Sequence, residues 1–136
     1  ARRAAGLLGS DDAYRDQMRA RLEDKHKMIE VLDSLGLLPP GYPRDAAKSE
    51  ELTGELHNAV IGFLASAESR LFVLNQEDLT KETEQQNLPG STWEYPNWRR
   101  KMRYSIEELE ADPRIADFTL MLRSWLDRTG RSPARS

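Results

Sequence analysis

The run RLFVLN, residues 70–75, decides which fold class the sequence predicts. It is short and apolar, it contains aromatic and β-branched residues, and the polar run QEDL, residues 76–79, bounds it. These properties are typical of one buried β-strand. A lone strand cannot make a sheet, because its backbone N–H and C=O groups need partners on both sides. The pattern therefore indicates the last βα unit of an α/β protein whose other strands are missing from this sequence.

The sequence before this run predicts helix. A first helix begins at Ser10 or Asp11 and continues to about Leu35, where Gly36 is placed to end it as a C-terminal cap. Its apolar residues recur at helical spacing and share one face: Tyr14, Met18, Leu22, Ile29 and Leu32. The stretch LLPPGYPRD follows as a rigid connector. A second helix, beginning in the segment from Asp45 to Ser49, is expected over residues 47–68.

Two further helices are expected near the C-terminus, at residues 105–111 and 113–129. Ser105 and Glu108 match the S-x-x-E pattern of a capping box, in which each residue bonds a backbone N–H of the first turn. The dipeptide Asp112–Pro113 supplies a cap followed by proline at the first helical position. Together these elements predict a mainly α chain with one short strand.

The composition argues against several classes of protein. The 136 residues fit one compact domain. A net charge of −3, from 20 basic and 23 acidic residues, argues against a nucleic-acid partner, since general nucleic-acid binders carry a basic excess. The basic run WRRKMRY, residues 98–104, is balanced by EELEAD at residues 107–112. The chain has no cysteine and no apolar run near the ~20 residues of a membrane span, which fits a cytoplasmic location and no membrane partner.

Few residues before the loop described next have the pattern of a chemical site. Glu77 and Asp78 are adjacent, so on an extended backbone their side chains point to opposite faces and cannot act as a catalytic pair. His26 and His57 lack the neighbouring ligands that a zinc site needs. The stretch GLLGS lacks the lysine of a phosphate-binding loop. The sequence therefore predicts no metal site and no cofactor.

The stretch NLPGSTWEYPNWRRK, residues 87–101, gathers aromatic and turn residues in one loop. Its rings can stack on the C–H faces of sugars: Trp93, Tyr95 and Trp98. Its amide and acid side chains can bond sugar hydroxyls: Asn87, Glu94 and Asn97. The alternative is that the tryptophan and proline side chains pack the loop onto the body of the protein. Composition leaves both interpretations open.

A longer pattern contains this loop. The segment QEDLTKETEQQNLPGSTWEYPNWRRKM, residues 76–102, is followed by an S-x-E-E-L helix and a terminal helix. This order resembles the C-terminal end of the amylomaltases, the bacterial and plastid 4-α-glucanotransferases also called disproportionating enzymes. The resemblance is clearest over residues 71–122.

The resemblance implies a parent enzyme with a (β/α)8 barrel that transfers segments of α-1,4-glucan between maltooligosaccharides with retention of configuration. The family uses an Asp nucleophile, a Glu acid/base and a transition-state-stabilising Asp that belongs to a His-Asp motif. Here Lys27 follows His26 and Asn58 follows His57, so this motif is absent. The resemblance therefore implies a C-terminal fragment without catalytic residues, inactive alone, whose substrate in the full-length enzyme is α-1,4-glucan or a maltooligosaccharide.

Within that barrel RLFVLN corresponds to the eighth strand. The chain then divides into a helix with its connector at residues 1–45, the last helix–strand–loop unit at 46–104, and terminal helices at 105–136. We expect the strand to be extended yet poorly paired. Such an edge, together with apolar surface exposed by truncation, would allow self-association of the fragment.

In such a barrel the loop after the eighth strand lies at the mouth, where substrate binds. The family motif gives Asn87, Pro89, Gly90, Pro96, Asn97 and Trp98 in this loop. We expect substrate contacts for Asn87, Trp93, Asn97 and Trp98. We expect structural roles in the loop for Glu77, Asp78, Pro89, Gly90, Pro96, Arg99 and Arg100. The two arginines are expected to pair with the carboxylates at positions 77 and 78.

A stand-alone helical interaction module, which docks a partner through the tryptophan-rich loop, is the alternative. It needs no partner strands. The reading frame upstream of Ala1 distinguishes the two hypotheses. A barrel with a His-Asp motif there supports the fragment, and a start codon near Ala1 supports the module.

Overall fold

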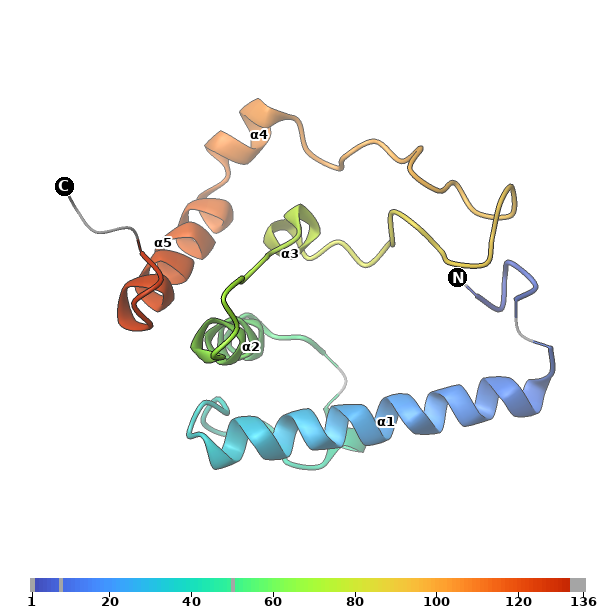
Figure 1. Cartoon of the computed structure of the whole chain (residues 1–136), viewed down its shortest axis with the longest axis horizontal. Helices are drawn as coiled ribbons and strands as arrows, with labels where there is room; N and C mark the ends of the chain where they lie inside the picture. The colour runs from blue at the N-terminus through green and yellow to red at the C-terminus, as the bar shows by residue number, and fades with distance from the viewer. Residues whose placement is uncertain (1, 8, 50, 133–136) are drawn as a thin grey trace.

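The computed structural model describes residues 2–7, 9–49 and 51–132, and all regular structure in these ranges is helical (Figure 1). The elements follow one another as α1 (Asp11–Ser34), the 3-10 turn η1 (Ala46–Lys48), α2 (Gly54–Ser66), α3 (Gln76–Thr80), α4 (Ile106–Ala111) and α5 (Pro113–Arg128). The predicted mainly α class is confirmed. None of the described helices is long and apolar enough to cross a membrane.

The helices α2 and α5 pack against each other, and α1 lies along the other side of α2 (Figure 1). The segment between α3 and α4 leaves this helical group and returns to it, passing close to the N-terminal residues (Figure 1). A methyl group on Gly90 in this segment would lie 3.9 Å from Leu7 Cδ2. The tip of the long loop therefore lies close to the start of the chain.

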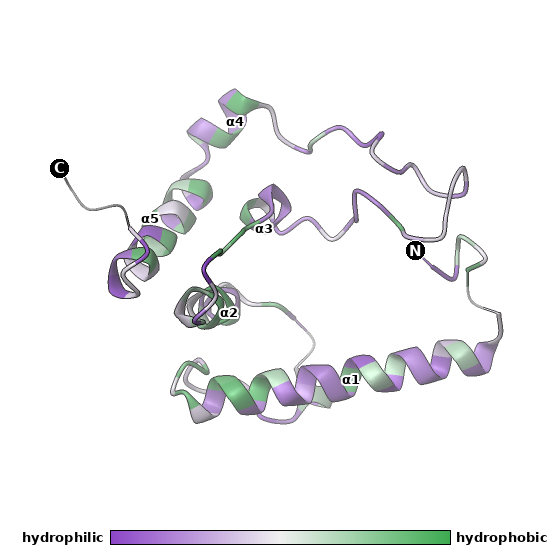
Figure 2. Ribbon diagram, viewed as in Figure 1, coloured by the Kyte–Doolittle hydropathy of each residue, from purple (hydrophilic) through white to green (hydrophobic). Residues whose placement is uncertain are grey.

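The predicted first helix is present, and Ser10 caps it by accepting a hydrogen bond from the Ala13 N–H at 3.1 Å. Only its C-terminal half is buried, where Leu32 packs against Leu56 and Ala59 of α2. Met18 and Leu22, which share the predicted apolar face, are half exposed. In Figure 2 the hydrophobic colouring of α1 is concentrated at its C-terminal end.

The predicted start of the second helix was wrong. The Asp45 side chain accepts from the Ala47 N–H and caps the separate turn η1. The Thr53 hydroxyl oxygen then accepts from the Leu56 N–H at 3.1 Å and starts α2 at Gly54. Two competing caps thus divide a segment that propensity alone predicts as continuous.

The predicted strand at residues 70–75 is not a strand in the structure. The segment runs irregularly from α2 to α3, and no described residue pairs with its backbone as a neighbouring strand would (Figure 1). A strand requires such a ladder. The polar run after it, expected only to bound the strand, forms α3, because Asn75 and Asp78 make a capping box.

The contact between α2 and α5 is the closest helix packing described. Trp125 of α5 lies against Gly62 of α2, and its indole N–H donates to Asn58 Oδ1 at 2.7 Å. His57 stacks on Phe118 with ring centroids 5.3 Å apart. The predicted caps of the C-terminal helices are confirmed, since Ser105 and Glu108 form a capping box and Asp112 caps α5.

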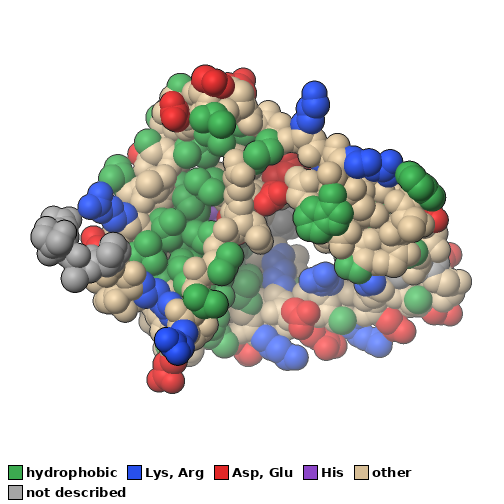
Figure 3. Space-filling model, turned by 45° about the horizontal axis from the view of Figure 1, so that its top comes forward, with side chains coloured by type: hydrophobic (Ala, Val, Ile, Leu, Met, Phe, Trp, Pro, Cys, Tyr) green, Lys and Arg blue, Asp and Glu red, His purple; other side chains and the backbone are tan. Residues whose placement is uncertain are grey.

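Hydrophobic side chains are unevenly distributed over the surface. In the space-filling view they gather on the half of the face that carries the helical group, and the half that carries the long loop shows fewer of them (Figure 3). The loop therefore differs from the helices in chemistry as well as in structure.

Candidate functional site

The loop at residues 84–101, called the aromatic loop below, is organised around Asn97. Its Oδ1 accepts from the Leu88 N–H at 2.7 Å, and its Nδ2 donates to the Ser91 carbonyl at 3.2 Å and the Ser91 hydroxyl at 3.0 Å. Both ends of the amide are therefore engaged by the loop itself. Asn97, which was predicted to contact sugar, therefore uses its side-chain amide to hold the conformation of the loop.

A second set of contacts anchors the aromatic loop through Tyr95. The ring is only 6% exposed, and its hydroxyl donates to the Gln85 carbonyl at 2.6 Å. Arg100 lies over this ring at 5.1 Å and pairs with Glu84 at 2.9 Å. The predicted partners of this arginine were Glu77 or Asp78, and the structure places Glu84 there instead. The chain folds back so that the two ends of the loop meet.

The tryptophan rings of the aromatic loop lie on the surface. Trp93 is 84% exposed and Trp98 is 75% exposed. The Arg99 guanidinium lies 5.3 Å from the centre of the Trp93 ring. Trp98 has φ +56°, a left-handed conformation that a bulky residue adopts only when its surroundings hold it there. Its N–H donates to the Gln86 carbonyl at 2.8 Å, which supplies one such restraint.

The turn residues of the aromatic loop differ in burial and in backbone conformation. Leu88 is 2% exposed, so its side chain is buried. Pro89 and Pro96 are exposed, and Asn87 is half buried. Gly90 has φ +87°, where other residues are strained.

Electrostatics inside the aromatic loop favour ionised carboxylates. Glu94 accepts from the Thr92 N–H at 2.8 Å. This backbone hydrogen bond is the main cause that lowers the pKa of the Glu94 carboxyl below its usual value. Glu94 therefore stays charged at neutral pH and holds the turn that carries Trp93.

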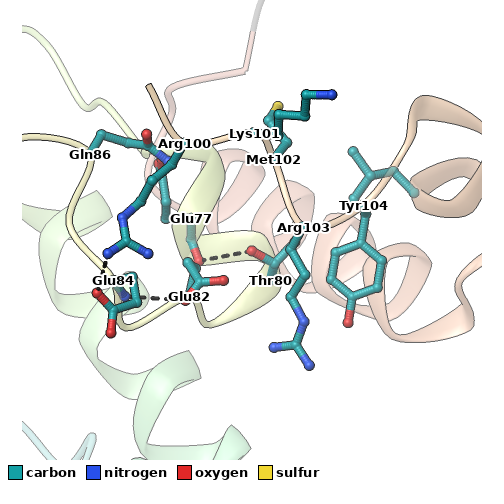
Figure 4. A pocket seen from close by; sticks show the side chains of 11 residues that line it. Glu77, Thr80, Glu82, Glu84, Gln86, Arg100, Lys101, Met102, Arg103 and Tyr104 are labelled. Carbon is teal, nitrogen blue, oxygen red and sulfur yellow. Dashed lines mark hydrogen bonds and ion pairs between the residues drawn. The ribbon is translucent and has the colours of Figure 1, made fainter. Parts of the chain in front are cut away.

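A small cavity of about 190 Å3 lies where the end of the aromatic loop passes α3 (Figure 4). Glu77 of α3, Glu82, Glu84, Arg100 and Tyr104 are among the residues that line it, and Arg100 extends toward Glu84 (Figure 4). Two of these acidic groups are engaged: Glu84 pairs with the arginine, and Glu82 Oε1 accepts from the Glu84 N–H at 3.2 Å. These contacts hold the end of the aromatic loop beside the residues that follow α3.

The other predicted residues lie apart from the aromatic loop. Asp78 Oδ2 accepts from the Asn75 N–H at 2.9 Å, so it caps α3. His57 is buried between α2 and α5, and this burial, together with the nearby charge of Lys81, lowers the pKa of its imidazole. His26 pairs with Glu30 on the surface of α1. Within the described ranges no histidine, aspartate and glutamate side chains cluster as metal ligands do.

Sequence reasoning missed the residues that hold the aromatic loop in its conformation. Leu88 and Tyr95 are the buried anchors of the aromatic loop, and Glu84 is the partner of its arginine. An apolar residue directly before the Pro-Gly turn was the available signal for the first of them. The second was grouped with the exposed rings, because sequence alone does not distinguish a buried tyrosine from an exposed one.

Comparisons with known proteins identify a family that this chain resembles in sequence. A protein-family model described as 4-alpha-glucanotransferase matches residues 12–107, which include the whole aromatic loop. A 4-alpha-glucanotransferase from Haemophilus influenzae is 28% identical over 117 residues. That match covers 86% of this chain and 16% of the relative, so the chain spans about a sixth of the length of the curated relative.

Proposed function

Because the chain belongs to the 4-alpha-glucanotransferase family, we propose that it is the C-terminal part of an enzyme that transfers α-1,4-glucan segments between maltooligosaccharides with retention. In this proposal the chain supplies the last part of a barrel and a wall of the glucan cleft. We assign that wall to the aromatic loop because its tryptophan rings are exposed and the loop that bears them is held by hydrogen bonds.

Exposed aromatic rings suit sugar recognition for a physical reason. The C–H groups on one face of a glucose ring form an apolar surface, and a flat ring removes this surface from water on contact. Trp93 and Trp98 are both more than two-thirds exposed. Without a bound partner, this apolar surface stays in contact with water, which is unfavourable. We propose that these two rings contact glucan directly.

Asn97 has a different role in this proposal. The hydrogen bonds of its side-chain amide span the turn from Leu88 to Ser91. Asn97 therefore holds in place the backbone that carries both tryptophan rings. It is a positioning residue, as are Tyr95 and Arg100 at the other end of the loop. Asn87, half buried beside this turn, is the remaining polar side chain proposed to reach a sugar hydroxyl.

The catalytic groups belong, in this proposal, to another part of the enzyme. A retaining transfer needs a protonated carboxyl as general acid, which requires a raised pKa. Among the described carboxyl groups four have a shifted pKa, and all four are lowered by hydrogen bonds: Asp33, Glu94, Glu107 and Asp112. These groups are poised to remain ionised and do not meet the requirement.

Titration of the chain with maltoheptaose, followed by the indole N–H signals in NMR, tests the binding role. The chain has three tryptophans, and Trp125 is tied to Asn58, so it serves as an internal control. We expect Trp93 and Trp98 to shift with maltoheptaose and not with the β-1,4-linked cellohexaose. Equal shifts with both sugars, or shifts of Trp125 alone, would contradict the proposal.

A protein-docking role is the second candidate, and the same exposed rings favour it. Tryptophan is enriched where proteins bind one another. The NMR titration separates the two candidates, because a docking surface has no reason to prefer an α-linked glucan. No response to either sugar would favour the docking surface.

A further inference from the structure

Two turns of the aromatic loop bring Arg99 to the ring of Trp93. Glu94 Oε2 accepts from the Thr92 N–H at 2.8 Å and from the Thr92 hydroxyl at 3.3 Å, which fixes the backbone beside Trp93. The Arg99 N–H donates to the Pro96 carbonyl at 3.1 Å, which closes the second turn. The backbone at both partners is therefore held by the loop itself.

The guanidinium of Arg99 lies over the face of the Trp93 ring. Its central carbon is 5.3 Å from the ring centre, within the limit of about 6 Å at which a cation and an aromatic face attract each other. The same guanidinium donates a long hydrogen bond, of 3.5 Å, to the carbonyl of the buried Tyr95. In the described chain Arg99, predicted to pair with Glu77 or Asp78, instead links an exposed ring to a buried anchor of the loop.

We propose that Arg99 is the positioning residue that orients Trp93 for glucan, an inference that rests on the proposed function of the aromatic loop. With the guanidinium over one face of the ring, a glucose unit stacks on the other face. A ring already held in one orientation loses less side-chain freedom on binding than a freely rotating ring. Arg99 thus raises the affinity for glucan through Trp93 and needs no contact of its own with the sugar.

The two tryptophans of the aromatic loop are restrained in different ways. Trp98 is restrained through its backbone, because its N–H donates to the Gln86 carbonyl at 2.8 Å. Trp93 is restrained through its ring, by the guanidinium of Arg99. The loss of Arg99 should therefore weaken the contribution of Trp93 to binding and leave that of Trp98 intact.

A spectroscopic test of the contact needs no sugar. The ring current of an indole moves the NMR signals of protons above its face upfield, so the side-chain signals of Arg99 should lie upfield of their ordinary positions. This shift should vanish in Trp93→Leu and persist in Trp98→Leu. Arg99 signals at ordinary positions in the parent chain would overturn the proposal.

A double-mutant cycle tests the effect on binding. The dissociation constant for maltoheptaose is measured by NMR titration of the chain, followed through the backbone amide signals of the aromatic loop. Arg99→Leu should raise it about two- to fivefold, the effect of one exposed cation–π contact, and Arg99→Lys should recover part of the loss. In the Trp93→Leu background Arg99→Leu should have no further effect, because an effect transmitted through a ring disappears with the ring. In the Trp98→Leu background it should keep its full effect.

The matched control is Arg128→Leu, which removes the guanidinium 3.9 Å from the centre of the Trp125 ring, outside the aromatic loop. It makes the same change of charge and should leave the dissociation constant unchanged. Far-UV circular dichroism should show the same helix content in all variants. A parent chain that does not respond to maltoheptaose would overturn the proposed function together with this inference. A parent chain that responds, with an Arg99→Leu effect that is absent, equally large without Trp93 or matched by Arg128→Leu, would overturn this inference alone.

Discussion

Trp125 of α5 lies so close to Gly62 of α2 that a Cβ at position 62 would be 2.2 Å from the tryptophan Cζ2 and 2.4 Å from its Cε2. Real Cβ atoms do not approach other atoms this closely. The ring is held there by its hydrogen bond to Asn58 and by Arg128, whose guanidinium lies 3.9 Å from the ring centre. The absence of a side chain at position 62 therefore permits the packing of α2 on α5.

The substitution Gly62→Ala should destabilise the chain although alanine favours helix. The methyl group must displace the Trp125 ring, and overpacking of this kind costs about 1–3 kcal/mol. Chemical denaturation measures the loss. Gly54→Ala in the same helix is the matched control, because its nearest neighbour is the flexible end of Lys81 at 3.9 Å. Equal stability of the two variants would show that the ring moves at no cost.

Arg131 should stabilise the end of α2 more than its surface position suggests. Its guanidinium donates to the Ala67 carbonyl, to the Ala65 carbonyl at 2.6 Å and to the Ser69 carbonyl at 2.7 Å. These hydrogen bonds satisfy backbone carbonyls that the C-terminus of a helix leaves without a partner. Arg131→Ala should cost about 1.5–3 kcal/mol, the range for hydrogen bonds to a charged group. The control Arg123→Ala, on the exposed side of α5, should change the melting temperature little. A similar loss in both variants would indicate a general charge effect.

His57 should make the stability of the chain fall in mild acid. Burial against Phe118 and the charge of Lys81 lower its pKa in the folded chain from the ordinary value of 6.5, so the unfolded chain binds a proton more readily. Stability is therefore complete above pH 6.5 and declines as the pH falls below it. Denaturation midpoints across this range measure the effect.

The variant His57→Gln removes the titrating group and should flatten this part of the pH profile. His26→Gln is the matched control, since His26 is exposed beside Glu30 and its loss should leave the decline in place. A decline that persists in His57→Gln would assign the pH dependence to other groups.

Features that depend on local sequence were predicted well, whereas features that depend on contacts between residues distant in sequence were not. The cap at Ser10 and the capping box of Ser105 are complete within a few residues, so the sequence contained all that the helix starts require. The strand at residues 70–75 depends on partners outside the segment, and the described chain offers none. The role of Asn97 depends on Leu88, nine residues away, so its residue type indicated hydrogen bonding and not the partner.

The chain alone should not disproportionate maltotriose. The described carboxyl groups with a shifted pKa are held ionised, and Glu84 in the small cavity is bound to Arg100, so none of these groups is placed to protonate a leaving oxygen. Chromatography of the sugars after incubation with purified chain should show maltotriose unchanged. Glucose and longer oligomers above the level of a mock preparation would contradict the proposal that the catalytic groups lie elsewhere.

In a full-length enzyme that contains this chain, Trp98 and Asn97 should separate binding from loop structure. Trp98→Ala removes an exposed ring, so kcat/KM for maltooligosaccharides should fall by up to about tenfold while the melting temperature changes little. Trp98→Gly should cause the same kinetic loss and a slightly higher melting temperature than alanine, because glycine relieves the strain at φ +56°. Asn97→Ala should lower both quantities, since the hydrogen bonds to Leu88 and Ser91 are lost. Normal kinetics in both Trp98 variants, measured well below the melt, would exclude a substrate contact for that ring.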